Sequence, residues 1–149
     1  MITDLESMQA ALIEARLAAD AGEVPIGAVV VWNREILARG QNRVLRSVDP
    51  TAHAEIIALR LAAEALGNYR LSGCTLYATL EPCAMCAGAM IHARLDRLVF
   101  AAADPKAGAA GSVLAVLNHP QLNHQMQVEQ GILADESAEL LRRFFRERR

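Results

Sequence analysis

Three apolar runs separated by two helical patterns constrain the fold of this chain more than any other feature. The runs cover 26–32, 75–80 and 98–102, and the helical patterns cover 53–66 and 83–94. Continuous β-branched and apolar runs are typical of strands that are buried on both faces. Strands that alternate with helices form crossover units, in which the helices pack against the sheet. The pattern therefore predicts an α/β domain with three layers, α/β/α, around a mixed sheet.

The flanking segments predict further elements, including the remaining two strands of a five-stranded sheet. An amphipathic helix is expected over 3–21, with Thr3 or Asp4 as its N-cap and Gly22 after its last residue. Asn33 and Arg34 indicate a tight turn into a second strand. The other expected elements are a strand over 35–42, a short helix over 113–117, an edge strand over 125–128 and a helix over 135–147.

The composition supports one folded domain that spans 1–149. Of the 149 residues, 53% are hydrophobic and 21% are charged, which excludes an intrinsically disordered chain. No apolar stretch reaches the ~18 residues of a membrane span. The first residues lack the basic and apolar regions of a signal peptide. We therefore expect a cytoplasmic protein with no membrane partner.

The charged residues are unevenly distributed, although the net charge is only −2. Residues 1–23 and 129–139 are acidic, whereas 140–149 contain five arginines and one acid. A second basic group flanks Asn42 and consists of Arg39, Arg43 and Arg46. Arginine suits contacts with phosphates and bases, so this distribution is compatible with an RNA partner that the net charge conceals. A solvated basic surface is the alternative.

The cysteines favour a site over a disulfide framework. The three are Cys74, Cys83 and Cys86, and an odd number with one C-x-x-C pair is not typical of disulfide-rich domains. Cys83 and Cys86 stand at the start of a predicted helix, where their spacing directs both the same way and free N–H groups favour thiolates. By itself the pair is compatible with a redox pair, half of a structural zinc site or two buried thiols.

His53 and Glu55 change this interpretation because they stand at the start of the other buried helix. If the two helix starts meet, His53, Cys83 and Cys86 supply three zinc ligands and a fourth position stays open, as in catalytic zinc sites. Glu55 is then a candidate for proton transfer beside the metal. One difficulty is that residues i and i+2 of a regular helix point different ways, so one of the two must reach round.

The segments His53-Ala54-Glu55 and Pro82-Cys83-Ala84-Met85-Cys86 resemble the H-x-E…P-C-x-x-C signature of the zinc nucleoside and nucleobase deaminases. Other segments are similar to the tRNA-specific adenosine deaminases within that superfamily. The most specific are the loop over 104–112 and the Phe144-Phe145-Arg146 tail. The resemblance extends over nearly the whole chain and implies a cytidine-deaminase-like fold.

This resemblance implies hydrolytic deamination of adenosine to inosine at the wobble position of a tRNA anticodon, usually of an arginine tRNA. One Zn²⁺ per subunit, bound by His53, Cys83 and Cys86, would carry the water that attacks C6 of adenine. Glu55 would take a proton from that water and deliver it to the ring nitrogen. The implied partners are a tRNA anticodon stem-loop and a second copy of the chain in a homodimer.

The resemblance also implies residues that contact the substrate. Asn42 and the backbone of Ala54 would contact the flipped base, and Ile26 and Leu80 would flank it. RNA contacts are implied for Asp104, Lys106, Phe145 and Arg146. Ala101 and Ala103 differ from the residues common in the family. Three residues either border the RNA site or cap short elements: His119, Asn123 and His124.

Two other functions fit the same motifs. A deaminase of free guanine or cytosine would use the same zinc chemistry, and an assay that offers a stem-loop beside free bases separates the two. A zinc-stabilised RNA-binding module would close its metal shell with four protein ligands, and a fourth ligand is not evident. Cys74 and His92 are expected to be a buried thiol and a packing or interface histidine.

Overall fold

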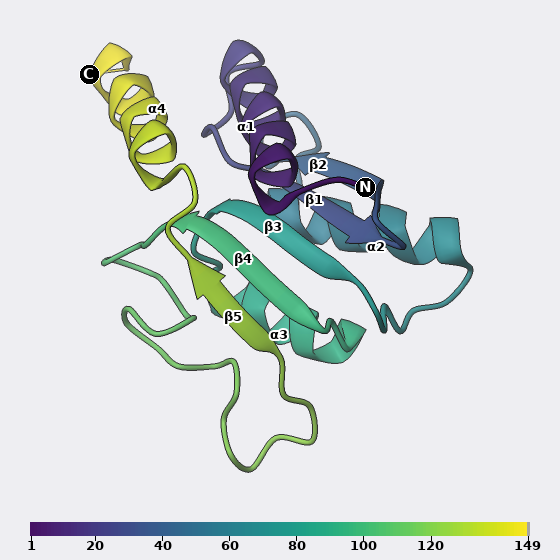
Figure 1. Cartoon of the computed structure of the whole chain (residues 1–149). Helices are drawn as coiled ribbons and strands as arrows, with labels where there is room; N and C mark the ends of the chain where they lie inside the picture. The colour runs from purple at the N-terminus through teal and green to yellow at the C-terminus, as the bar shows by residue number, and fades with distance from the viewer. Residues whose placement is uncertain (149) are drawn as a thin grey trace.

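The computed structural model describes residues 1–148 and has a central five-stranded sheet with the strand order β2-β1-β3-β4-β5 (Figure 1). The strands are β1 (Gly27–Trp32), β2 (Glu35–Gln41), β3 (Thr75–Leu80), β4 (Arg97–Ala102) and β5 (Gln127–Gln130). The helices are α1 (Asp4–Asp20), α2 (Ala54–Leu66), α3 (Ala84–Ala93) and α4 (Ala134–Glu147). The predicted α/β class and the mixed five-stranded sheet are confirmed.

The sheet is mixed because β1 runs antiparallel to both of its neighbours, β2 and β3, while β3, β4 and β5 are parallel. Strands β2 and β3 therefore run the same way, and α2 is the crossover between them. Helix α3 is the crossover from β3 to β4. Both helices begin at the edge of the sheet where β2, β3 and β4 end, which is where α/β proteins bind ligands.

Side chains of the central strands alternate between two apolar layers, as the period of two requires. Val30, Leu76 and Leu98 pack in the cluster that contains the buried residues of α2 and α3. Val29 and Tyr77, one position along, pack against α1 on the opposite face. Figure 1 shows α1 and α4 in front of the sheet and α2 and α3 behind it. The continuous apolar runs of the sequence follow from this burial on both faces.

Local sequence signals explain where the first elements begin and turn. Thr3 caps α1 in a reciprocal capping box with Glu6, in agreement with one of the two predicted caps. Asn33 and Arg34 both have positive φ, 51° and 69°, which is the conformation of a tight hairpin turn. These residues connect β1 to β2 at the position expected from the sequence.

The prediction of a short helix over 113–117 is wrong. This part of the long segment between β4 and β5 forms turns and a single bridge between Ala110 and Ala115. Its N–H groups are engaged outside any helix, because Val113 and Leu114 donate to the carbonyl of Gly108 and Val116 donates to that of Ala109. The edge strand also differs, since it forms at Gln127–Gln130 rather than at 125–128.

Within residues 1–148, none of the helices combines the length and the apolar character that crossing a membrane would require.

Candidate metal centre and substrate groove

His53 and Cys83 each occupy the residue before a helix, and not its first turn as the sequence pattern had indicated. His53 is the N-cap of α2, with φ −73° and ψ 153°, and Cys83 is the N-cap of α3, with φ −75° and ψ 177°. Because His53 has extended backbone, the rule that separates positions i and i+2 of a helix does not apply to His53 and Glu55. The start of α2 thus resolves the difficulty posed by their spacing.

The close approach of Gly40 to α2 sets the position of this helix start. A Cβ atom on Gly40 would lie 2.3 Å from the carbonyl oxygen of Ala54 and 2.7 Å from the nitrogen of Ala58. Only glycine allows β2 to come this near to the first turn of α2. The contact brings His53 toward the end of β3, where Cys83 follows.

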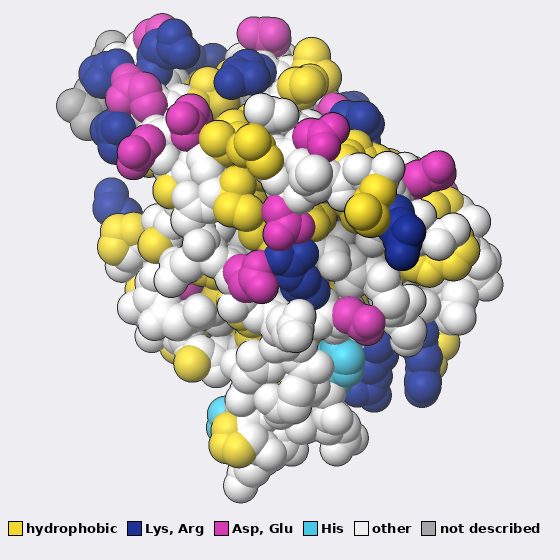
Figure 2. Space-filling view, viewed as in Figure 1, with side chains coloured by type: hydrophobic (Ala, Val, Ile, Leu, Met, Phe, Trp, Pro, Cys, Tyr) yellow, Lys and Arg dark blue, Asp and Glu magenta, His cyan; other side chains and the backbone are white. Residues whose placement is uncertain are grey.

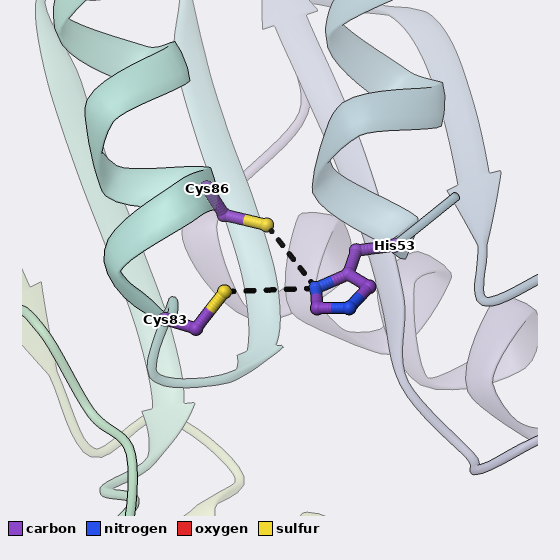
Figure 3. Close-up of side chains that lie close together, drawn as sticks. All are labelled: His53, Cys83 and Cys86. Atoms are coloured by element: carbon purple, nitrogen blue, oxygen red, sulfur yellow. Dashed lines mark hydrogen bonds between the residues drawn. The ribbon is translucent and has the colours of Figure 1, made fainter. Parts of the chain in front are cut away.

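The ligand atoms of His53, Cys83 and Cys86 lie within 4.8 Å of one another (Figure 3). The Nδ1 atom of His53 is 3.6 Å from Sγ of Cys83 and 3.4 Å from Sγ of Cys86. Tetrahedral zinc with ordinary Zn–N and Zn–S bonds separates such atoms by about 3.5 Å. One nitrogen and two sulfur donors at this spacing fit zinc. In the part of the chain that the structure describes, no fourth His, Cys, Asp or Glu joins the group.

The two thiols of this group differ in acidity. Hydrogen bonds with Cys86 and with His53 lower the pKa of Cys83 to about 3. The same bond with Cys83, together with burial, raises the pKa of Cys86. The bond to Cys83 also raises the pKa of His53. Because zinc binds thiolate and neutral imidazole, a metal that binds here must displace the protons that remain on these groups.

Glu55 is buried beside the metal ligands, with 4% of its surface exposed. Burial raises the pKa of Glu55, while the nearby His53 opposes this shift. The Cys86 thiol acts on this pKa in the same direction as His53. A carboxyl group in such a position can accept and return a proton next to a bound metal.

A groove of about 930 Å³ lies between the ends of β3 and β4 and helix α4. Five residues that the sequence indicated for substrate contact line it together: Leu80, Asp104, Lys106, Phe145 and Arg146. Arg142 and Arg148, from the basic tail, also line it, as does Val24, to which the sequence analysis gave no role. The structure thus brings together residues up to 124 positions apart, from Val24 to Arg148.

The other three residues indicated for substrate contact, Ile26, Asn42 and Ala54, do not line this groove. Asn42 is largely buried, and its side chain donates to the Val24 carbonyl at 3.4 Å and accepts from the Val44 N–H at 3.2 Å. Its backbone N–H donates to the carbonyl of Ile26. Ala54 is fully buried at the start of α2. Val24 connects the two sets, because it contacts Asn42 and also lines the groove.

The loop after Asn42 is held by Glu23, a buried residue to which the sequence analysis gave no role. The Glu23 carboxylate accepts from the backbone N–H groups of Leu45 and Arg46 at 3.0 and 2.9 Å, and from Nε of Arg46 at 3.0 Å. Burial alone would raise the pKa of Glu23, but these hydrogen bonds outweigh it and hold the pKa below its usual range. The clue in the sequence is an acidic residue beside the apolar Val24-Pro25-Ile26 segment.

The tail arginines are partly neutralised by acidic residues of their own helix. Arg142 and Arg146 bind Glu139 at 3.0 and 3.1 Å, and all three side chains are exposed. Arg148 lies over the ring of Phe144, 3.7 Å from its centroid, and Arg149 lies outside the described residues. Figure 2 shows basic and acidic side chains mixed over α1 and α4.

His119 makes a local contact, whereas His124 contacts a residue 29 positions away. Nδ1 of His119 accepts from the Gln121 N–H at 3.2 Å, and Nε2 of His124 lies at the carbonyl oxygen of Leu95.

Cys74 is buried, and burial raises its pKa to about 11, so this thiol is an inert core group. Asp104 shapes its own loop, because its Oδ1 accepts from the N–H groups of Lys106 and Ala107.

Sequence comparisons place this geometry among known proteins. The family described as MafB19-like deaminase matches residues 2–149. A tRNA-specific adenosine deaminase of Agrobacterium fabrum is 51% identical over 142 residues, which cover 95% of this chain and 93% of the relative. One from Bacillus subtilis is 46% identical over 149 residues, covering 100% of this chain and 92% of the relative. This chain belongs to the tRNA-specific adenosine deaminases.

Solved structures agree with this membership. A structure from a study of A-to-I editing by tRNA:A34 deaminases is 49% identical, with a TM-score of 0.88 over 91% of this deaminase and 98% of that chain. A guanine deaminase from Nitrosomonas europaea is 30% identical, with a TM-score of 0.80 over 97% of this deaminase and 85% of that chain. Since a guanine deaminase shares the fold, substrate choice must come from residues around the site.

Proposed function

We propose that this enzyme converts adenosine to inosine at the wobble position of a tRNA anticodon, with an arginine tRNA as its first candidate substrate. The observation that carries the proposal is the three-ligand group beside buried Glu55, near an extended groove with basic side chains. A groove of this extent, lined by Lys106 and Arg146, suits an RNA loop better than a single free base. The family membership supports the same conclusion.

His53, Cys83 and Cys86 would hold one zinc ion per chain. When bound there, zinc supplies a Lewis acid that makes water more acidic and leaves a coordination position open. Glu55 would take up the proton released from water and pass it to the ring nitrogen of adenine. Because Glu55 is buried, bulk water does not compete for that proton.

The base would enter between the end of β3 and the start of β1, flanked by Leu80 and Ile26. Asn42 has donor and acceptor capacity beyond its two protein partners, so its side chain can still contact a base edge. The Ala54 backbone would complete this pocket. Asp104, Lys106, Phe145 and Arg146 would hold the flanking nucleotides in the groove, with Phe145, half exposed, available for stacking.

A homodimer would cover an apolar surface on the outer faces of α2 and α3. Ile56, Leu59 and Ala89 line a shallow cavity between these helices. Tyr69, which also lines this cavity, and Met85, one turn before Ala89 on α3, are exposed apolar residues. Light scattering at micromolar concentration measures whether the enzyme has the mass of two chains.

A free-base deaminase is the second candidate, and the likeness to a guanine deaminase favours it. The deciding assay offers the purified enzyme an arginine-tRNA anticodon stem-loop with wobble adenosine, and separately guanine, cytosine and cytidine. We expect inosine in the stem-loop and none in a matched stem-loop with the adenosine moved one position away. Rapid turnover of a free base, with no inosine in RNA, would refute the proposal.

A further inference from the structure

Glu81 is a buried carboxylate at the junction of the metal group and the groove. It stands between Leu80, which lines the groove, and Pro82-Cys83, and only 3% of its surface is exposed. Its side chain points toward the 104–112 loop. It does not belong to the group of candidate metal ligands. The proposed mechanism gives it no part.

Four donors of one loop satisfy the Glu81 carboxylate. Oε1 accepts from the Asp104 N–H at 2.9 Å and from the Ser112 hydroxyl. Oε2 accepts from the N–H groups of Ala110 and Ser112 at 3.0 and 3.1 Å. Among residues 1–148, no Lys, Arg or His forms an ion pair with this carboxylate. The buried charge is therefore compensated by the loop alone, and only while the loop keeps this conformation.

The backbone on either side of Glu81 is tied to the same region. The Glu81 N–H donates to the carbonyl of Ala102 at 2.8 Å, and the Ala109 N–H donates to the carbonyl of Pro82 at 2.8 Å. The loop and the residue before Cys83 are thus joined by a direct backbone hydrogen bond. Displacing the loop would leave a buried charge without hydrogen bonds, which is costly.

Gly108 gives independent evidence that the loop is built around this carboxylate. A Cβ atom on Gly108 would lie 2.3 Å from Cδ of Glu81 and 2.5 Å from both carboxylate oxygens. Gly108 does not have positive φ, so its backbone conformation is open to other residues. What excludes a side chain at Gly108 is the position of the Glu81 carboxylate.

We propose that Glu81 is a positioning residue that holds the 104–112 loop against the metal centre, so that Lys106 and the groove wall meet the RNA in a fixed place. The inference rests on the proposed function, because it assigns that loop to substrate binding. Glu81 touches neither substrate nor metal, and it acts through the loop. Its loss should therefore weaken binding of the stem-loop and leave the chemical step nearly unchanged.

The test compares Glu81→Gln with Glu35→Gln, a matched change at an exposed residue at the far end of β2. In Glu81→Gln, an NH₂ group replaces one of the two carboxylate oxygens. Each oxygen accepts from two of the four donors, so the NH₂ group, itself a donor, faces two donors whichever oxygen it replaces. We expect amide hydrogen exchange at Asp104, Ala110 and Ser112 to accelerate at least about tenfold, and KM for the stem-loop to rise on the order of ten- to hundredfold. The kcat should stay within about threefold and zinc content should stay at one per chain.

The direction of the KM change separates positioning from electrostatics. Glu81→Gln removes a negative charge, which by itself would strengthen the attraction of RNA. A rise in KM therefore reports lost positioning. Glu35→Gln should change neither KM nor amide exchange.

Gly108→Ala provides a second route that changes no charge and keeps the test decisive if Glu81→Gln folds poorly. Its methyl group should push the carboxylate off the loop and reproduce the rise in KM. In the double variant the two effects should not add, because both break the same contact. Additive effects, unchanged amide exchange in both single variants, or a fall in kcat at constant KM would overturn the proposal.

A wrong assignment of the substrate would give a different experimental result from a wrong role for Glu81. If the wild-type enzyme makes no inosine in the stem-loop, the substrate assignment is wrong. Amide exchange in the same variants then still decides whether Glu81 holds the loop.

Discussion

Nδ1 of His53 lies 3.4 Å from Sγ of Cys86, although 33 positions separate them in the chain. The two residues come from the starts of different helices, α2 and α3 (Figure 3). These helices follow β2 and β3, which run the same way on either side of β1 and end at the same edge of the sheet. Each helix is a crossover on the same face of the sheet, so both starts reach the same edge. The metal group is thus a direct product of the sheet topology.

Removing one ligand should remove the metal. Cys86→Ala is expected to lower bound zinc from one per chain to about a tenth or less, because the two remaining ligands hold zinc weakly. Deaminase activity should be lost with it. Metal analysis after dialysis measures the effect. Cys74→Ala, which removes a thiol from the core, should keep one zinc per chain; full zinc occupancy in Cys86→Ala would contradict the assignment.

Glu55 should be required for chemistry and not for binding. Glu55→Gln keeps the size of the side chain, and Glu55→Ala removes it. Each should reduce the single-turnover rate of inosine formation by about 10²–10⁴-fold, because proton transfer is lost. Zinc content and stem-loop affinity should stay within about twofold of the wild type. A variant that retains its rate, or that loses its metal, would show that Glu55 has another role.

Arg146 should contact phosphate, so binding of the stem-loop should depend on salt. Its exposed pair with Glu139 contributes little stability and leaves the guanidinium available. Arg146→Ala should reduce the slope of log affinity against log salt concentration by about 0.7, the value for one phosphate of a single strand. Arg70→Ala, an exposed arginine at the other end of β3, should leave the slope unchanged. A salt-independent affinity of the wild type would exclude phosphate contacts.

Asp4 should make the free energy of unfolding depend on pH in the acidic range. Hydrogen bonds from Arg97 and Tyr77 lower the pKa of Asp4 to about 2, from 3.8. Since the folded state holds the lower pKa, this stabilisation is present above pH 3.8 and is lost as the pH falls toward 2. Asp4→Asn should therefore be less stable than the wild type at pH 5, and the difference should shrink between pH 4 and pH 2.

Urea unfolding at several pH values measures this difference. The effect should be modest, because the Asp4 side chain is 40% exposed and water screens its pair with Arg97. Asp20→Asn removes a charge from the other end of α1 without touching Arg97 and serves as the control. A difference between wild type and Asp4→Asn that stays constant down to pH 2 would rule out this linkage.

The sequence contained enough information to predict the layers and the three residues that the structure brings together as a candidate metal site. The strand β1 is buried continuously from Gly27 to Val30, and the continuous apolar run of its sequence was recognisable without any contact information. His53, Cys83 and Cys86 belong to residue types with strong metal chemistry, and their motifs are specific. Such candidate ligands can be recognised from the sequence because metal binding depends on the identity of the residues.

The prediction of a short helix over 113–117 was wrong because tertiary contacts outweigh the local preference of those residues. Its residues have apolar character that suits a helix, but the backbone there follows the path set by Gly108 and by the Ala110–Ala115 bridge. A preference spread over five residues is weak beside such tertiary contacts.

The tertiary structure alone decided how Glu23 and Glu81 are used. Each carboxylate is buried by residues distant in sequence and is satisfied largely by backbone N–H groups of a loop that lines or adjoins the site. Every residue other than proline has such an N–H group, so the partners leave no pattern in the sequence. Thus the sequence identified the candidate metal ligands and Glu55 by their residue types, whereas the fold determined which buried carboxylates bond to the surrounding loops.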